Sequence, residues 1–175
     1  MISAMLHLLL STLGGIAMGA RLAVIVPMTI SSVVHACAPQ VAPRTALAII
    51  KVESGGHPWA IGDNTSSKAY FPNTRDDAVA LAADLLAKGH SLDVGLMQVD
   101  SIHFESDEGS LYRVFDPCVN VAMGSRILEG SYQAAVRVYG PGQVALFHAF
   151  ERYNSGRLLG SPRYAKTVWE AGLTL

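Results

Sequence analysis

A mainly α-helical fold, with a short β-hairpin or irregular loop region, is predicted by three features of this 175-residue sequence. Apolar residues recur at three- and four-residue spacing in several segments, which is the pattern of amphipathic helices. Capping residues, proline and glycine stand at the ends of those segments. A turn-rich stretch at residues 57–73 is too irregular for a long element. The length suits one domain, and no internal repeat or long linker indicates a second.

The first 36 residues have the composition of a targeting segment. They contain no acidic side chain and one basic side chain, Arg21, which an apolar run follows. Small residues close the run, as at a cleavage site, so we predict a signal peptide over residues 1–36, export of the chain and a mature domain over residues 37–175. The pattern also allows translation to begin at Met18. A retained anchor is the alternative, which Pro27 and the shortness of the run disfavour.

The chain has two cysteines, Cys37 and Cys118, and both follow the predicted cleavage site. Exported proteins commonly join such a pair, so we predict one disulfide. Two unpaired buried thiols are the alternative.

Five helices are predicted from caps and periodicity. The first begins at Pro43 or Thr45 and ends at Val52 or Glu53, before Gly55 and Gly56. The second follows a capping box at Thr74 and ends at Gly89. The remaining three are expected from Asp116 to about Tyr139, from Val144 to Tyr153, and from Ser161 past Tyr164 and Val168, while residues 90–100 are expected to be an apolar, turn-bearing stretch.

Glu53 is the most informative single residue. It shares one helical face with Ala46, Ile49 and Ile50, so its carboxyl should lie at the edge of a buried stripe. Loss of hydration there raises the pKa of a carboxyl and keeps it protonated, as general-acid cleavage of a glycosidic bond requires. The alternative is an ordinary solvated glutamate at a helix end.

Composition and motifs exclude several other functions. Thirteen basic and fourteen acidic residues give no overall field for binding nucleic acid. The six histidines show no metal-ligand spacing, and His148 with Glu151 is interpreted as a surface pair. Phosphate-binding loops and serine nucleophile elbows have no counterpart in the sequence, so we expect neither a metal nor a cofactor.

Five segments, in order, resemble a known family. They are Glu53-Ser-Gly, Gly95-Leu-Met-Gln98, Asp116-Pro-Cys-Val-Asn120, Ala149-Phe-Glu-Arg-Tyr-Asn-Ser-Gly156 and a final Tyr164. Together they resemble the lysozyme-like lytic transglycosylases, and most closely the small exported ones of bacterial type IV secretion systems. The resemblance covers residues 37–168.

The resemblance implies a lysozyme-like (soluble lytic transglycosylase) fold and a periplasmic monomer that acts on peptidoglycan, with components of a type IV secretion or conjugation machine as partners. It implies that Glu53 is the acid and then the base, and that an anhydro sugar forms. It also implies substrate-contacting roles for Ser54, Met97, Gln98, Tyr153, Asn154 and Tyr164. Among these, Met97, Asn154 and Tyr164 could instead be a core residue, a helix cap and a buried helix contact.

Two other functions stay open. A hydrolytic lysozyme on the same fold would need a positioned water, usually held by a second carboxylate, but Asp63 and Asp93 are interpreted as turn or cap residues. A non-catalytic peptidoglycan-binding subunit would gain little from a desolvated acid. We expect Glu53, Gln98 and Tyr153 to converge on one cleft, with Tyr153 or Asn154 within hydrogen-bond reach of Glu53, directly or through one water.

Overall fold

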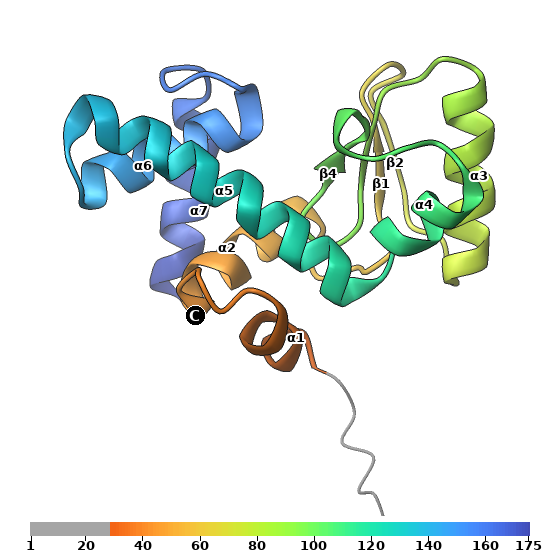
Figure 1. The fold of residues 1–175 in the computed structure, drawn as a ribbon, viewed down its shortest axis with the longest axis horizontal. Coiled ribbons are helices and arrows are strands. Elements are labelled where there is room, and N and C mark those ends of the chain that lie inside the picture. Colours follow the sequence, from red (N-terminus) through yellow and green to blue (C-terminus); the bar gives the residue numbers. More distant parts are fainter. Residues whose placement is uncertain (1–28) are drawn as a thin grey trace, which may run out of the picture.

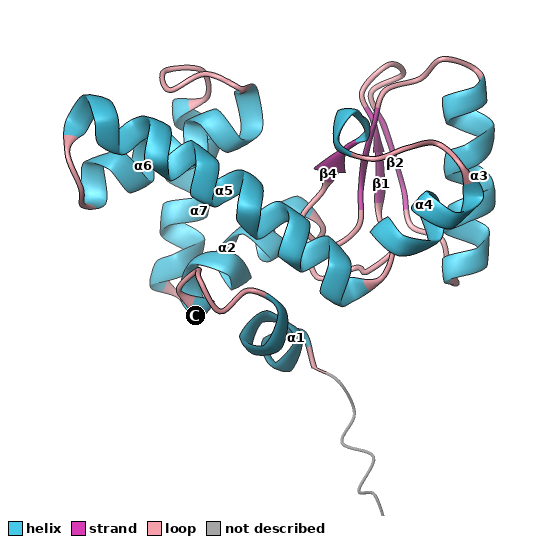
Figure 2. Cartoon of the chain, viewed as in Figure 1, coloured by secondary structure: helices cyan, strands magenta, loops and turns pink. Residues whose placement is uncertain are grey.

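The computed structural model describes residues 29–175, and in this range it contains helices, one 3₁₀ turn and four short strands. In chain order they are α1 (Ile30–Cys37), α2 (Pro43–Glu53), β1 (Ile61–Asp63), β2 (Lys68–Tyr70), α3 (Arg75–Ala87), β3 (Leu92–Val94), β4 (Val99–Asp100), η1 (Ser101–His103), α4 (Glu108–Val114), α5 (Pro117–Tyr139), α6 (Gln143–Ser155) and α7 (Pro162–Leu173). The mainly α prediction is confirmed (Figure 2).

The smaller lobe is built on an antiparallel sheet with strand order β2-β1-β3-β4. Helices α3 and α4 lie beside this sheet (Figure 1). Strand residues such as Leu92, Val94 and Val99 share one buried cluster with Leu111 of α4 and Phe115. The sheet is therefore stabilised mainly by apolar packing against α3, which lies between β2 and β3 in the chain, and against α4, which follows β4.

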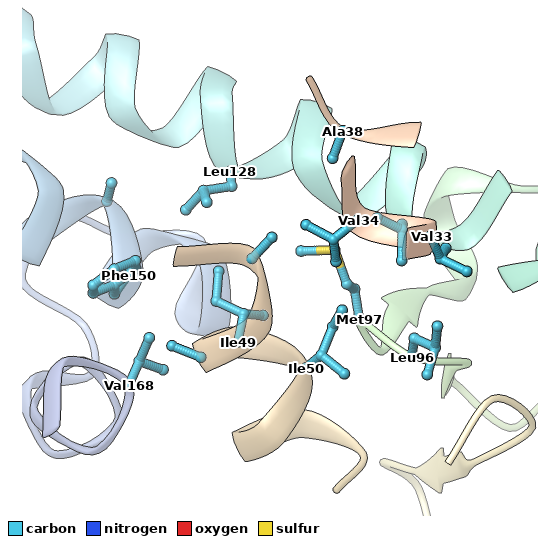
Figure 3. Close-up of a cluster of buried hydrophobic side chains, with 14 of the residues drawn as sticks. Val33, Val34, Ala38, Ile49, Ile50, Leu96, Met97, Leu128, Phe150 and Val168 are labelled. Carbon is cyan, nitrogen blue, oxygen red and sulfur yellow. The ribbon is translucent and has the colours of Figure 1, made fainter. Parts of the chain in front are cut away.

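The larger lobe is helical, and α5 is its longest element. Helix α5 packs along α6, α1 also contacts α5, and α2 packs against α7 (Figure 1). Ile49 and Ile50 of α2 are fully buried beside Leu128 of α5, Phe150 of α6 and Val168 of α7 (Figure 3). The hydrophobic core of the helical lobe therefore fixes the position of the end of α2, where Glu53 lies.

The helix boundaries follow the capping residues that were predicted. Thr74 accepts a hydrogen bond from the Asp77 amide at the start of α3. Asp116 accepts from the amides of Cys118 and Val119 at the start of α5, where Pro117 needs no donor. Helix α6 ends at Gly156, whose φ of +74° lies in the left-handed region that glycine adopts without strain.

Helix α1 covers the predicted end of the signal peptide. It begins after a Thr29 cap, and Val33 and Val34 are 4% and 0% exposed in the core of the helical lobe. A cleavage after Ala36, as predicted, would remove those side chains and leave a cavity in this core. The targeting segment itself, with Met18 as an alternative start, lies outside the described residues. Among the described helices, none is long and apolar enough to cross a membrane.

The predicted disulfide is present. Cys37 at the end of α1 bonds to Cys118 in the first turn of α5, with 5.3 Å between the two Cα atoms. The bridge closes a sequence separation of 81 residues and ties α1 to the helical lobe.

Two regions of the structure, residues 90–100 and residues 108–114, differ from the sequence prediction. The strands β1 and β2 lie in residues 57–73, where a short hairpin was predicted. Residues 90–100 form β3 and β4 around a tight turn, and these two strands complete a four-stranded sheet. Helix α4 was not predicted, although Asp107 caps it and Leu111 and Val114 bury its inner face. Both elements are too short to show a clear hydrophobic period.

Candidate active site

A cleft of about 290 Å³ opens between the two lobes. The residues that line it come from six separate parts of the chain: Glu53, Asn64, Asp93, Gln98, Asp100, His103, Ile127, Tyr153 and Asn154. The expected convergence of Glu53, Gln98 and Tyr153 on one cleft is therefore observed.

Glu53 is the last residue of α2. Ala46, Ile49 and Ile50 on the preceding turns are buried, as their spacing predicts, and Glu53 is half-buried at the end of this stripe. Gly55 and Gly56 both have positive φ, so the chain turns away directly after the acid. The carboxyl thus extends from a rigid helix end into the cleft.

Tyr164 of α7 holds the carboxyl in place. Its hydroxyl donates a hydrogen bond to Glu53 Oε1, and the packing of α2 against α7 brings the two residues together across 111 positions of sequence. Burial, with the nearby charge of Glu53, raises the pKa of Tyr164 far above its usual value. Tyr164 therefore stays a phenol and a donor at any ordinary pH.

The environment of Glu53 changes its acidity. Burial raises the pKa of Glu53 from 4.5 to about 7, although the Tyr164 hydrogen bond lowers it and the charge of Asp93 raises it further. A carboxyl with a pKa near neutrality can donate a proton and later accept one.

Asp93 and Asp100 supply two more carboxyls to the same cleft. They are directly paired between β3 and β4, and Asn64 donates a hydrogen bond of 3.0 Å to Asp93 Oδ2. Burial raises the pKa of Asp93, as does the charge of Asp100. Asp93 is a strand residue that faces the cleft, so its interpretation as a turn or cap residue was wrong.

Asp63 has the turn role that the sequence indicated. It is buried, and its carboxyl accepts hydrogen bonds from the amides of Thr65 and Ser66 and lies 2.8 Å from His90 Nδ1. Burial alone would raise its pKa, but hydrogen bonds from Ser66 and His90 lower it to about 2. Asp63 therefore shapes the hairpin and does not line the cleft.

Gln98 is held rigidly by the turn that carries it. Its φ is +45°, and its Nε2 donates to the carbonyls of Gly95 at 2.9 Å and Ala60 at 3.2 Å. The amide oxygen remains as the group that can accept a hydrogen bond from a ligand.

Two residues with predicted substrate contacts, Ser54 and Met97, are buried and do not line the cleft. Ser54 is buried, and its hydroxyl donates to the Leu96 carbonyl at 2.8 Å. Met97 is fully buried in the core of the helical lobe (Figure 3). Both lie behind the cleft and connect the end of α2 to the turn at residues 95–98.

Tyr153 and Asn154 line the cleft from the end of α6, but their hydrogen bonds go elsewhere. The Tyr153 hydroxyl donates to the Met97 carbonyl at 2.7 Å, and the Asn154 side chain accepts from Ser161 at 2.7 Å. The direct hydrogen bond to Glu53 comes from Tyr164, whereas a contact through one water stays a prediction for Tyr153 or Asn154.

Asn120 supports the site, and sequence reasoning did not single it out. Its fully buried amide accepts from Met97 N at 2.8 Å and donates to the carbonyls of Val94 and Val114 at 2.8 and 3.0 Å. A Cβ at Gly95 would lie 2.2 Å from this amide, which explains the glycine. The available signal was a polar side chain in the first turn of a helix that is otherwise apolar on that face.

His148 and Glu151 were interpreted as a surface pair, but the structure buries Glu151. Glu151 is 2% exposed, and its Oε2 lies 2.5 Å from His148 Nδ1. The pair also reaches the Leu158 carbonyl, so it connects α6 to the loop that follows. Neither residue lines the cleft.

The half-buried carboxyl of Glu53, held by a tyrosine in a cleft between a helical lobe and a small sheet, places the protein in the lysozyme-like class. The chain belongs to the transglycosylase SLT domain family, whose sequence model matches residues 32–159. This match begins inside α1, in agreement with the packing of that helix.

Curated relatives of the chain are named virB1, and those from Brucella are named as type IV secretion system proteins. The chain is 39% identical over 140 residues to the type IV secretion system protein virB1 of Brucella abortus, covering 75% of this chain and 59% of that protein. It is 36% identical over 124 residues to protein virB1 of Agrobacterium fabrum, covering 69% of this chain and 49% of that protein. The chain thus spans about half to three-fifths of the length of these relatives. No solved structure matches it.

Proposed function

We propose that this protein is a peptidoglycan lytic transglycosylase in which Glu53 acts first as the acid and then as the base. The observation that carries the proposal is the placement of Glu53 in the cleft. Its carboxyl accepts a hydrogen bond from Tyr164, and burial raises the pKa of Glu53 to about 7. Membership of the transglycosylase SLT domain family supports the same reaction class.

The reaction follows from one carboxyl group. Tyr164 occupies Oε1, so Oε2 of Glu53 carries the proton and gives it to the oxygen of the β-1,4 bond between N-acetylmuramic acid and N-acetylglucosamine. The bond from the anomeric carbon to this oxygen breaks, and N-acetylglucosamine leaves with a hydroxyl. The C6 hydroxyl of the muramyl residue then attacks the anomeric carbon, and its proton returns to Glu53. The product is a 1,6-anhydromuramyl end, and water is not consumed.

The rest of the cleft supports a sugar strand. The amide oxygen of Gln98 and the exposed amide of Asn154 can bond to hydroxyl and N-acetyl groups. The N-acetyl group of the substrate can stabilise the positive charge that develops at the anomeric carbon, so a second enzymic carboxylate is not obligatory.

The cellular setting is inferred from the relatives. We infer that the protein acts in the periplasm, as a monomer, and opens the cell wall locally for such a machine. The type IV secretion name of the Brucella relative supports the link to the machine. Because Val33 and Val34 are packed, we place the end of any removed leader before Thr29.

Replacement of Glu53 by Gln tests this function. The E53Q variant keeps the shape of the side chain but has no transferable proton, so release of soluble fragments from purified sacculi should fall by at least about 10³-fold. Activity within tenfold of the parent would refute the assignment.

The same variant has an expected effect on stability that serves as its folding control. Because the pKa of Glu53 is higher in the folded protein, the protonated group stabilises the fold fully below pH 4.5, and this contribution is lost as the pH rises through about 7. The neutral Gln has no such loss, so E53Q should unfold at a higher temperature than the parent at pH 8, by an amount equivalent to about 1–3 kcal/mol.

A hydrolytic lysozyme is the second candidate, and one observation favours it. Asp93 and Asp100 line the cleft together with Glu53, and paired carboxylates could hold a water for attack at the anomeric carbon. Asp100 Oδ1, however, already accepts from the Ile102 amide at 3.0 Å, and Asp93 Oδ2 accepts from Asn64. The two products differ by one water, which mass analysis of the fragments distinguishes.

A further inference from the structure

A second hollow of about 190 Å³ lies next to the catalytic cleft. His103, at the end of η1, lines both spaces. The second hollow is bounded by the segment after η1 and by α4, with Phe104, Glu105, Ser110 and Arg113 in its wall.

Helix α5 shows that the two hollows are parts of one groove. Val119 and Met123 line the second hollow, and Ile127 lines the catalytic cleft. These residues are spaced by four positions, so they lie on one face of the helix in successive turns. The groove therefore runs along α5 from the catalytic acid toward the beginning of that helix.

The charges change along this groove. The acidic and basic side chains that line the catalytic cleft are Glu53, Asp93 and Asp100 together with His103, so its permanent charges are carboxylates. The second hollow contains one side chain of each sign, the carboxyl of Glu105 and the guanidinium of Arg113. Arg113 is exposed, and within residues 29–175 it has no carboxylate partner within 4.0 Å.

A guanidinium with free donors selects carboxylates. Its planar array of N–H groups matches the two oxygens of a carboxylate, and such charged hydrogen bonds are stronger than neutral ones. Sugar rings of the glycan strand are neutral, so they need no cation. Of the side chains that line the two hollows, Arg113 is the one permanent cation, so an anionic substituent of the strand would bind there rather than beside the carboxylates of the catalytic cleft.

We propose that the second hollow is a subsite for a carboxylate carried by the muramyl residues of the strand, with Arg113 as the residue that determines this specificity. The inference rests on the proposed function for the identity of the strand. Phe104 and Met123 provide apolar surface for the remainder of the substituent. The carboxylate has two sources: the lactyl group of an unsubstituted muramyl residue, or the free carboxylates of a stem peptide.

The test measures binding without cleavage, in the whole chain carrying E53Q. The probes are soluble glycan strands that bear stem peptides, strands stripped of peptides by an amidase, and chitin oligomers, which contain no carboxylate. Arg113→Gln is compared with Arg126→Gln, which removes an equally exposed cation from α5 outside both hollows.

Arg113→Gln should weaken binding of carboxylate-bearing strands by about 5- to 20-fold and leave chitin binding unchanged, while Arg126→Gln should change neither. A loss confined to peptide-bearing strands assigns the subsite to the stem peptide, and a loss that extends to stripped strands assigns it to the lactyl group. Equal affinities of the Arg113 and Arg126 variants for both kinds of strand would overturn the proposal, as would an equal loss of chitin binding.

This binding assay is independent of the proposed reaction. If the parent protein fails to cleave sacculi but Arg113 controls strand binding, the enzymatic proposal fails and the subsite stands. If the parent cleaves sacculi and Arg113 has no effect on binding, the subsite fails alone.

Discussion

Glu53 and Tyr164 form the chemical centre of the site, and each depends on the other. Burial at the end of α2 raises the pKa of Glu53, whereas the Tyr164 hydroxyl stabilises the ionised form and limits that rise. Together they leave the acid protonated in a useful fraction of molecules near neutral pH. The rate of cleavage should therefore fall as the pH rises through about 7, because the proton to be donated is lost.

Tyr164→Phe tests this balance. Removal of the donor takes away stabilisation of the carboxylate, so the pKa of Glu53 should rise and the alkaline limb of the pH–rate profile should move upward by roughly one pH unit. The maximal rate should also fall, because the carboxyl is less well oriented. The measurement is the release of soluble fragments across pH 5–9.

Tyr153→Phe is the matched control, since the Tyr153 hydroxyl donates to the Met97 carbonyl and not to Glu53. Its alkaline limb should stay where it is in the parent. An unmoved or downward-shifted limb in Tyr164→Phe would show that this tyrosine does not set the acidity of Glu53.

At this scale the sequence predicted the acid but not its surroundings. The apolar stripe before Glu53 was enough to indicate a buried carboxyl. The partner could not be chosen among Tyr153, Asn154 and Tyr164, because the choice depends on how α2 packs against α7. Ser54 and Met97 are neighbours of cleft residues in sequence, yet adjacent side chains point in different directions, and both of these point inward.

At the scale of elements, five helices of the described residues were predicted, whereas α1, α4 and the strands of residues 90–100 were not. Helices α2, α3, α5, α6 and α7 have caps or terminal glycines that the sequence displays. The strands are two or three residues long, which is too short for an alternating pattern to be recognised. As a result, Asp93 and Asp100 were not recognised as paired residues that face the cleft.

Residues 30–36 of helix α1 were assigned to the signal peptide because of their composition. An apolar helix that packs in a core and the hydrophobic region of a signal peptide have similar composition. The difference lies in tertiary contacts: Val33 and Val34 are buried while Ser31, Ser32 and His35 are exposed. Such one-sided burial identifies α1 as a part of the domain.

The disulfide between α1 and α5 should be a large contributor to stability. In the chain-entropy model, a bridge that closes a separation of 81 residues contributes about 4 kcal/mol. A variant with Cys37→Ser and Cys118→Ser should melt about 10–15 °C below the parent. Thermal unfolding followed by circular dichroism measures this difference.

Reductant provides the control for the bridge. The chain has no other cysteine, so reductant should lower the melting temperature of the parent toward that of the double variant and leave the variant unchanged. A parent protein that melts at the same temperature with and without reductant would show that the bridge does not stabilise the fold.

At the scale of the whole molecule, the site exists only because two lobes meet. Glu53 comes from the end of α2, Gln98 from the turn between β3 and β4, and Tyr153 from the end of α6. The order of these residues in the chain suggested a shared cleft only through a family resemblance. Asn120 holds the turn between the lobes, and this buried role follows from three-dimensional packing that spacing does not reveal.

The most direct test of the central claim is the fate of water during cleavage. Purified parent protein is incubated with sacculi in water enriched in heavy oxygen, and the released muropeptides are examined by mass spectrometry, with E53Q as the inactive control. Intramolecular attack by the C6 hydroxyl uses no water, so the account predicts anhydromuramyl ends that are one water lighter than reducing ends and carry no heavy oxygen. Reducing muramyl ends that contain heavy oxygen would contradict transglycosylation and assign the cleft to a hydrolase.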